Sequence, residues 1–248
     1  MSQTEHRILD WPLPASDVRG KPFTGPGAPK WRFAHFARIV VGGIFIAIYR
    51  TRFVGEYHVP EGACILAGNH SSTFDPFMIY GRSPKGMIHF IAKKELWKHR
   101  AVGWAVDHLG AIPVYRGTAD RQMIKMTTDL LKAGEKVGIY PEGTRVYEAG
   151  PDGHGDSHGG TAFLSILSGA PVVPHGIGGI ERIMPKGTKI PHFPRVVYSF
   201  GAPIYPGEFE GSNRERVEAM TAAIMDSIVR ERERARAMSE GRMPIGEE

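Results

Sequence analysis

The 248-residue sequence has very little cysteine: Cys64 stands alone. A single cysteine forms neither an intrachain disulfide nor a cysteine zinc cluster, which excludes redox chemistry by a cysteine pair and fits a reducing compartment. Long apolar runs are also missing, since no run approaches the roughly 20 residues that a membrane-spanning helix needs. The first residues are polar and proline-rich, unlike a secretory signal peptide. We therefore expect a protein that is not exported.

Charge of one sign is not concentrated anywhere in the chain. The formal net charge is +5, with 42% hydrophobic and 23% charged residues, which is ordinary globular composition and favours anionic partners. The arginines near the end alternate with Glu231 and Glu233, so their field is partly cancelled. No basic stripe with interleaved aromatic residues is present, so nucleic acid is not an expected partner. The expected anionic partner is therefore a phosphorylated substrate or an anionic membrane.

The first 52 residues divide into two parts. Residues 1–29 are rich in proline and glycine and predict a flexible arm. Residues 30–52 contain basic and aromatic residues but no acidic residue, and their spacing predicts an amphipathic helix. Such a helix fits an anionic membrane interface at the cytoplasmic face of the cell membrane, with the protein bound peripherally. The alternative is a helix that covers the domain's own core.

The rest of the chain alternates short apolar runs with helical patterns. This alternation predicts a single α/β domain over residues 53–238, with a mixed, mostly parallel sheet flanked by helices and a flexible tail at 239–248. The expected strands are residues 53–58, 63–67, 87–92, 111–115, 137–140, 170–174 and 196–200. The expected helices are residues 120–133, 161–168 and 213–238, the last ending in an Arg/Glu run that we interpret as solvated.

A histidine and an aspartate follow the second expected strand, in the stretch Asn-His-Ser-Ser-Thr-Phe-Asp-Pro. His70 and Asp75 are five residues apart and can meet only if the chain turns between them, which the small polar residues favour. An imidazole held by a carboxylate has one fixed tautomer and a second nitrogen able to accept a proton, so the pair predicts a general base. The alternative is a turn histidine and a helix-capping aspartate.

Two further strand ends carry groups that suit an anion. After the strand at 137–140 come Glu142, Gly143, Thr144 and Arg145, where the glycine allows close backbone approach and the last two side chains can donate to phosphate oxygens. An ordinary glycine turn with solvated charges is the alternative. Arg116 follows the strand at 111–115, where a salt-bridge role is the alternative.

The strand at 170–174 ends at Pro174, which we expect to form a wall for an acyl chain. His175 and the glycines after it fit a turn better than a site. The acidic and histidine residues of the loop at 152–158 are spaced by glycines that leave ligands unorganised, so we expect no metal. The sequence also has no Gly-x-Ser-x-Gly elbow for a nucleophilic serine.

In this order and spacing, the four motifs resemble the glycerolipid acyltransferases, typified by 1-acylglycerol-3-phosphate and glycerol-3-phosphate acyltransferases. The resemblance spans residues 53–203 and is carried mainly by NHSSTFD, with the histidine and aspartate of the HX4D motif, and by YPEGTR. It implies that His70 and Asp75 are the catalytic pair. It also implies phosphate binding by Arg116, Glu142, Gly143 and Arg145, and a fourth-motif role for Pro174.

The resemblance implies transfer of a fatty acyl group from acyl-CoA or an acyl carrier protein to a phosphorylated glycerolipid, without a cofactor. The expected reaction makes phosphatidic acid from 1-acylglycerol-3-phosphate, with His70 as general base and no covalent intermediate. A glycerol-3-phosphate acyltransferase, another lysophospholipid acyltransferase or a transacylase of the same fold are the alternatives. Tyr115, Val146 and the stretch at 157–160 depart from the family's usual residues, and these departures concern the identity of the acceptor.

Overall fold

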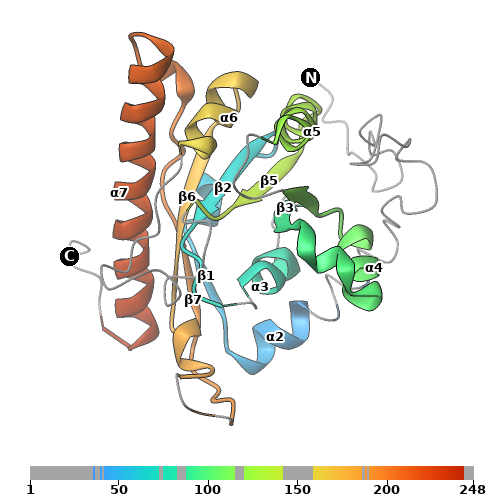
Figure 1. The fold of residues 1–248 in the computed structure, drawn as a ribbon. Helices are drawn as coiled ribbons and strands as arrows, with labels where there is room; N and C mark the ends of the chain where they lie inside the picture. The colour runs from blue at the N-terminus through green and yellow to red at the C-terminus, as the bar shows by residue number, and fades with distance from the viewer. Residues whose placement is uncertain are drawn as a thin grey trace, which may run out of the picture.

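The computed structural model describes residues 36, 40, 42–72, 75–82, 88–114, 120–141, 159–185, 188 and 190–242. These residues form a sheet in the order β1-β7-β6-β2-β5-β3-β4, drawn in Figure 1. Its strands are β1 (Arg52–Val54), β2 (Cys64–Gly68), β3 (Ile88–Lys93), β4 (Ile112–Val114), β5 (Lys136–Ile139), β6 (Val172–Gly178) and β7 (Val197–Phe200).

Strand direction gives the sheet two different edges. Strands β2 to β6 run parallel, while β7 is antiparallel to β6 and β1 is parallel to β7. The five parallel strands therefore end on one edge, which we call the carboxyl edge, and β1 and β7 begin there. In open α/β sheets, ligands bind outside the carboxyl ends of the parallel strands.

Helices cover both faces of the sheet (Figure 1). One hydrophobic core joins the sheet to α2 (Gly43–Ile48) and α3 (Asp75–Arg82), and we call this side the α3 face. The other core contains residues of α5 (Arg121–Lys132), α6 (Gly160–Ser168) and α7 (Asn213–Ser239), and we call this side the α7 face. A further helix, α4 (Arg100–His108), follows the 3-10 helix η3 (Lys94–Lys98). The predicted α/β domain with a mixed, mostly parallel sheet is confirmed.

The long helix α7 packs directly on the backbone of β6. A Cβ atom on Gly176 would lie 2.0 Å from the Arg232 backbone nitrogen, and one on Gly178 would lie 2.3 Å from that of Arg236. Real Cβ atoms do not approach so closely, so these two glycines set the distance between helix and sheet. The prediction of a turn after Pro174 was wrong, because β6 continues to Gly178.

The Arg/Glu run of α7 is not simply a solvated helix end. Ala235 is fully buried, and the Ser199 hydroxyl on β7 donates a hydrogen bond to Glu231 Oε2. Near the end of the helix, Arg182 donates to the Ser239 carbonyl at 3.2 Å. The run is therefore amphipathic, with one side packed on β6 and β7, and the solvated interpretation was wrong for that side.

The other predicted elements match the structure within a few residues. Asp120 caps α5 by accepting from the Gln122 and Met123 amides, and Gly169, in the left-handed region at φ 79°, ends α6. The expected strand at 53–58 is shorter, because β1 ends at Val54 and a 3-10 helix follows.

The predicted helix at 30–52 is only partly within the described residues. Helix α2 ends at Ile48, because the chain turns at Tyr49 and Arg50 before β1 begins at Arg52. The helix end at 52 was therefore wrong. The arm at 1–29 and residues 243–248 lie outside the described residues.

Among the helices of the described ranges, none combines the length and the apolar character needed to cross a membrane.

Candidate active site

His70 lies two residues beyond the end of β2, at the carboxyl edge, between the neighbouring strands β5 and β6. The Asn69 side chain fixes where the chain leaves the sheet. Its Oδ1 accepts from the Ile177 amide at 2.7 Å, and its Nδ2 donates to the Ile177 carbonyl at 3.3 Å. A side-chain amide thus replaces one backbone pair with β6, and the main chain turns away toward His70.

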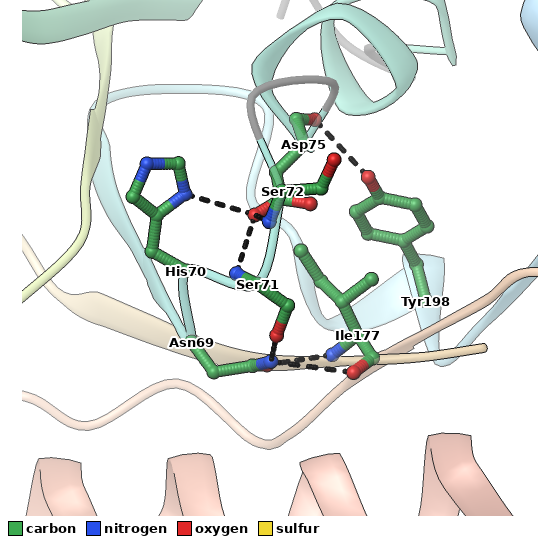
Figure 2. A network of polar contacts seen from close by, with 7 residues as sticks. All are labelled: Asn69, His70, Ser71, Ser72, Asp75, Ile177 and Tyr198. Carbon is green, nitrogen blue, oxygen red and sulfur yellow. Dashed lines mark hydrogen bonds and ion pairs between the residues drawn. The ribbon is translucent and has the colours of Figure 1, made fainter. Parts of the chain in front are cut away.

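The turn after His70 brings the imidazole and the Asp75 carboxylate together, as Figure 2 shows. His70 Nδ1 lies 2.9 Å from Asp75 Oδ2, and that oxygen also accepts from the Ser71 and Ser72 amides at 2.7 and 2.9 Å. An oxygen that collects two backbone donors is an acceptor, which assigns the Nδ1 proton to the histidine. The predicted contact between the two side chains is confirmed.

The two partners differ in exposure. The His70 side chain is 22% exposed and the Asp75 side chain is 0% exposed. Burial raises the pKa of the Asp75 carboxyl above its ordinary value, while the hydrogen bonds from His70, Ser72 and Ser71 oppose that shift. A buried and relatively basic carboxylate is a strong acceptor for Nδ1–H, and it stabilises the imidazolium that forms when Nε2 takes a proton.

Two tyrosines complete the surroundings of the pair. The ring of Tyr140, directly after β5, stacks on the His70 imidazole with centroids 4.4 Å apart and planes at 17°. The Tyr198 hydroxyl donates to the Asp75 carbonyl at 3.0 Å, which ties the start of α3 to β7 (Figure 2). Neither role was predicted from the sequence. The alternation of β5 could have placed Tyr140 on the α3 face, but nothing local to Tyr198 points to residue 75.

His175 lies beneath this site, inside β6. It is fully buried beside Tyr140, Tyr198 and Phe200, and neither ring nitrogen has a hydrogen-bond partner among the described residues. Burial lowers the pKa of His175 to about 3, so the ring is neutral at physiological pH. A Cβ atom on Gly68 would lie 2.2 Å from His175 Nε2, so any larger residue at the end of β2 would displace the His175 ring.

The remaining predicted site residues are distributed differently. Arg116, Glu142, Gly143, Thr144 and Arg145 lie outside the described residues. The strands that precede them, β4 and β5, end on the same edge as β2.

Pro174 is buried in β6 on the α7 face, where its ring would meet a Cβ atom on Gly201 at 3.1 Å. It therefore does not share a face with His175 and Tyr140. Its assignment to the acyl pocket stays a prediction that the motif alone carries.

Cys64 is the buried first residue of β2, and burial raises the pKa of its thiol to about 12. A thiol of that pKa supplies almost no thiolate for nucleophilic attack. Within the ranges that the structure describes, no three His, Cys, Asp or Glu side chains are grouped as metal ligands. The loop at 152–158, where we expect no metal, lies outside those ranges.

The part of the chain that matches known proteins contains the His70–Asp75 pair. The family model described as Acyltransferase matches residues 50–178, which include β2, the His70–Asp75 pair and the whole of β6. The chain belongs to the acyltransferase family. The match spans the pair and the strands that position it, so the chain is an O-acyltransferase by class.

Several curated relatives share this part of the chain. A 1-acyl-sn-glycerol-3-phosphate acyltransferase of Bacillus subtilis is 30% identical over 68% of this chain and 80% of its own length. One from Pseudomonas aeruginosa is 32% identical over 79% of this chain and 75% of its own. The chloroplastic BAT2 enzyme of Brassica napus is 31% identical over 64% of this chain. The chain spans only 46% of that longer plant protein.

The crystal structure of the 1-acyl-sn-glycerophosphate acyltransferase PlsC from Thermotoga maritima has the same fold. It superimposes with a TM-score of 0.61, 24% identity, and coverage of 82% of this chain and 80% of its own. At this identity the likeness concerns the fold.

Proposed function

We propose that this protein is a 1-acylglycerol-3-phosphate acyltransferase that makes phosphatidic acid by general-base catalysis. The observation that carries the proposal is the hydrogen bond from His70 Nδ1 to the buried Asp75 carboxylate at the carboxyl edge. The names of the Bacillus and Pseudomonas relatives support this choice of acceptor.

The chemistry starts at the second ring nitrogen. With Nδ1 protonated, His70 Nε2 is basic and takes the proton of the acceptor hydroxyl while that oxygen attacks the carbonyl carbon of an acyl thioester. Asp75 stabilises the imidazolium. The tetrahedral intermediate collapses, the carbon–sulfur bond breaks, and the proton on His70 neutralises the departing thiolate. Acyl transfer is direct, and the buried, protonated thiol of Cys64 supports a route without an acyl-cysteine.

The acceptor's phosphate requires cationic and hydrogen-bonding groups. We assign this role to Arg116 and Arg145, with Thr144 as a donor, Gly143 allowing close backbone approach and Glu142 orienting Arg145. β4 and β5 end at the carboxyl edge, which supports delivery of these residues to the side of the sheet where His70 lies.

The donor in this proposal is acyl-CoA or an acyl carrier protein, no cofactor takes part, and the enzyme works at the cytoplasmic face of the cell membrane. Helix α2 supports an interfacial role through Ile44 and Ile48, which are 52% and 45% exposed. Phe36 and Val40 precede them at the same spacing of four and are also exposed. We call these four side chains the α2 stripe.

An assay panel tests the proposal. Purified protein is given labelled acyl-CoA with lysophosphatidic acid, glycerol 3-phosphate or lysophosphatidylcholine, and products are identified by mass spectrometry. We expect phosphatidic acid as the main product, and we expect Arg145→Ala to lose activity with lysophosphatidic acid more severely than Arg145→Lys. Preference for glycerol 3-phosphate, or acyl exchange without acyl-CoA, would replace this function with one of the alternatives.

A further inference from the structure

The connection between β6 and β7 exposes large apolar side chains. Met184, Ile190 and Phe193 are 56%, 75% and 58% exposed. We call these three residues the β6–β7 patch. Single exposed apolar residues are common on protein surfaces, but a group of large ones within one connection marks an interaction site.

The patch is held in place by the rest of the molecule. The His192 amide donates to the Ile183 carbonyl at 2.7 Å, which closes the connection on itself. Arg50, just after α2, donates to the Phe193 carbonyl at 2.9 Å, and the rings of Tyr49 and Phe193 stack with centroids 6.0 Å apart. These contacts hold Phe193 next to the end of α2 and bring the chain beside Met184 close to the chain beside Phe193.

The patch and the α2 stripe lie on the same edge of the sheet as the candidate active site. The connection leaves β6 at Gly178 and enters β7 at Val197, and these two residues are paired at the carboxyl edge. Helix α2 precedes β1, which also begins there, and it packs against α3, the helix that starts with Asp75. Figure 1 shows α2 and this connection at the same end of the molecule.

The charges around the patch are mainly positive. Arg50 and Arg52 are exposed beside it, and Arg195 is partly exposed, against the exposed Glu181. Apolar side chains ringed by arginines match an anionic bilayer, which offers negative headgroups above hydrocarbon.

We propose that Met184, Ile190 and Phe193 insert into the interface of an anionic membrane and form a second lipid contact beside the α2 stripe. Two contacts on one edge fix the orientation of the molecule, so that His70 faces the bilayer and a lipid acceptor reaches it without leaving the membrane. The delivery of a lipid acceptor to His70 rests on the proposed function. The membrane contact itself is tested without any acyl transfer.

Site-directed labelling tests insertion. Because the native Cys64 is buried and its thiol pKa is raised to about 12, Ile190→Cys is labelled selectively with a polarity-sensitive fluorophore. The probe vesicles contain phosphatidylcholine alone or mixed with phosphatidylglycerol. We expect a blue shift with the mixed vesicles. Leu167→Cys, 46% exposed at the opposite edge where α6 leads into β6, is the matched control and is expected to show none.

Binding is measured with unlabelled variants in a vesicle sedimentation assay. Met184→Ser/Ile190→Ser is expected to weaken partition into the mixed vesicles by about tenfold or more, because transfer of apolar surface is lost. Leu167→Ser/Tyr205→Ser is expected to bind as the wild type does. Both double variants should keep wild-type activity on a water-soluble short-chain acceptor without vesicles, which shows that they are folded.

Equal vesicle binding by Met184→Ser/Ile190→Ser and the wild type would overturn the proposal. A wild-type protein that is a dimer in vesicle-free solution, together with a Met184→Ser/Ile190→Ser variant that is a monomer, would also overturn it. The patch would then join two copies of the chain. Loss of vesicle binding in the variant, with no acyl transfer by the wild type, would support the lipid contact and reject the proposed function.

Discussion

The two faces of the sheet are built for different purposes. On the α7 face, glycines let a long helix contact the backbone of β6, and apolar side chains fill the core. On the α3 face, Asp75 Oδ1, the Tyr140 hydroxyl and both nitrogens of His175 are buried without hydrogen-bond partners among the described residues. Unpartnered buried polar atoms cost stability. The α7 face stabilises the domain, whereas the α3 face loses some stability because it places these polar atoms near the reacting groups.

The sharpest test of this division is His70→Ala. Loss of the general base should lower turnover by about 10²- to 10⁴-fold, because no positioned base then removes the proton of the substrate hydroxyl. The melting temperature should change little, since His70 is partly exposed. Rate and thermal unfolding are measured together, with the exposed His192→Ala as control. A His70→Ala protein with near-normal turnover would remove the proposed mechanism.

The α7 face should respond in the opposite way. Gly176→Ala places a Cβ atom against the α7 backbone and should cost about 3 kcal/mol, a drop of roughly 6–12 °C in melting temperature. Activity per folded molecule at low temperature should be kept.

Gly160→Ala is the matched control for Gly176→Ala, because no atom lies within 4 Å of the position that its Cβ atom would take. Its melting temperature should stay near the wild-type value. A Gly176→Ala protein that unfolds normally but turns over slowly would break the division between the two faces.

Substitutions at Tyr140 distinguish the role of its ring from that of its hydroxyl. Tyr140→Leu removes the flat surface on His70 and should lower kcat by about tenfold, with a shifted pH profile, because the imidazole loses its fixed plane. Tyr140→Phe should retain activity and unfold at the same or a higher temperature, since the hydroxyl is buried without a partner in the described part of the chain. Equal activity in Tyr140→Leu would show that the stacking is not needed.

Acid sensitivity should come from two buried histidines, His175 on the α3 face and His89 on the α7 face. In the folded protein, burial lowers the pKa of His175 to about 3, so the ring stays neutral until the pH falls to about that value. In the unfolded chain the ring has its ordinary pKa of about 6.5 and takes a proton below that pH. Its contribution to stability is thus present above pH 6.5 and is lost as the pH falls. His89 acts in the same direction, with a pKa lowered to about 4 by burial. His175→Leu should flatten the slope of melting temperature against pH in this window, and an unchanged slope would exclude His175 as its source.

The smallest effect is expected at Glu135, just before β5 at the opposite edge of the sheet. Burial raises the pKa of Glu135 to about 8, from 4.5, so the folded state holds the proton more tightly than the unfolded state. Stability should therefore fall as the pH rises from 4.5 through 8. Glu135→Gln should remove that decline without changing turnover, as a melting series and a rate assay can check.

Much of the fold and the central contact could be predicted from the sequence, for local reasons. Apolar runs between turn residues mark the strands, and the polar turn before Pro76 predicts that His70 and Asp75 meet. Contacts across the sheet left no local signal. The sequence around His175 looks like a turn, because Pro174 and the following glycines suit one. Only contact with α7, whose Arg232 and Arg236 come more than fifty residues later in the chain, explains Gly176 and Gly178.

The hydrogen bonds between Asn69 and Ile177 also bear on protein engineering. One side-chain amide holds both backbone groups of Ile177, so Asn69 attaches the start of the segment after β2 to the sheet, and the Tyr198 hydroxyl holds its end at Asp75. A designer could therefore transplant the segment 69–75 onto another parallel sheet if the adjacent strand offers an unpaired N–H and C=O at that level. Proline at position 177 is forbidden for the same reason, however well its ring fills the core.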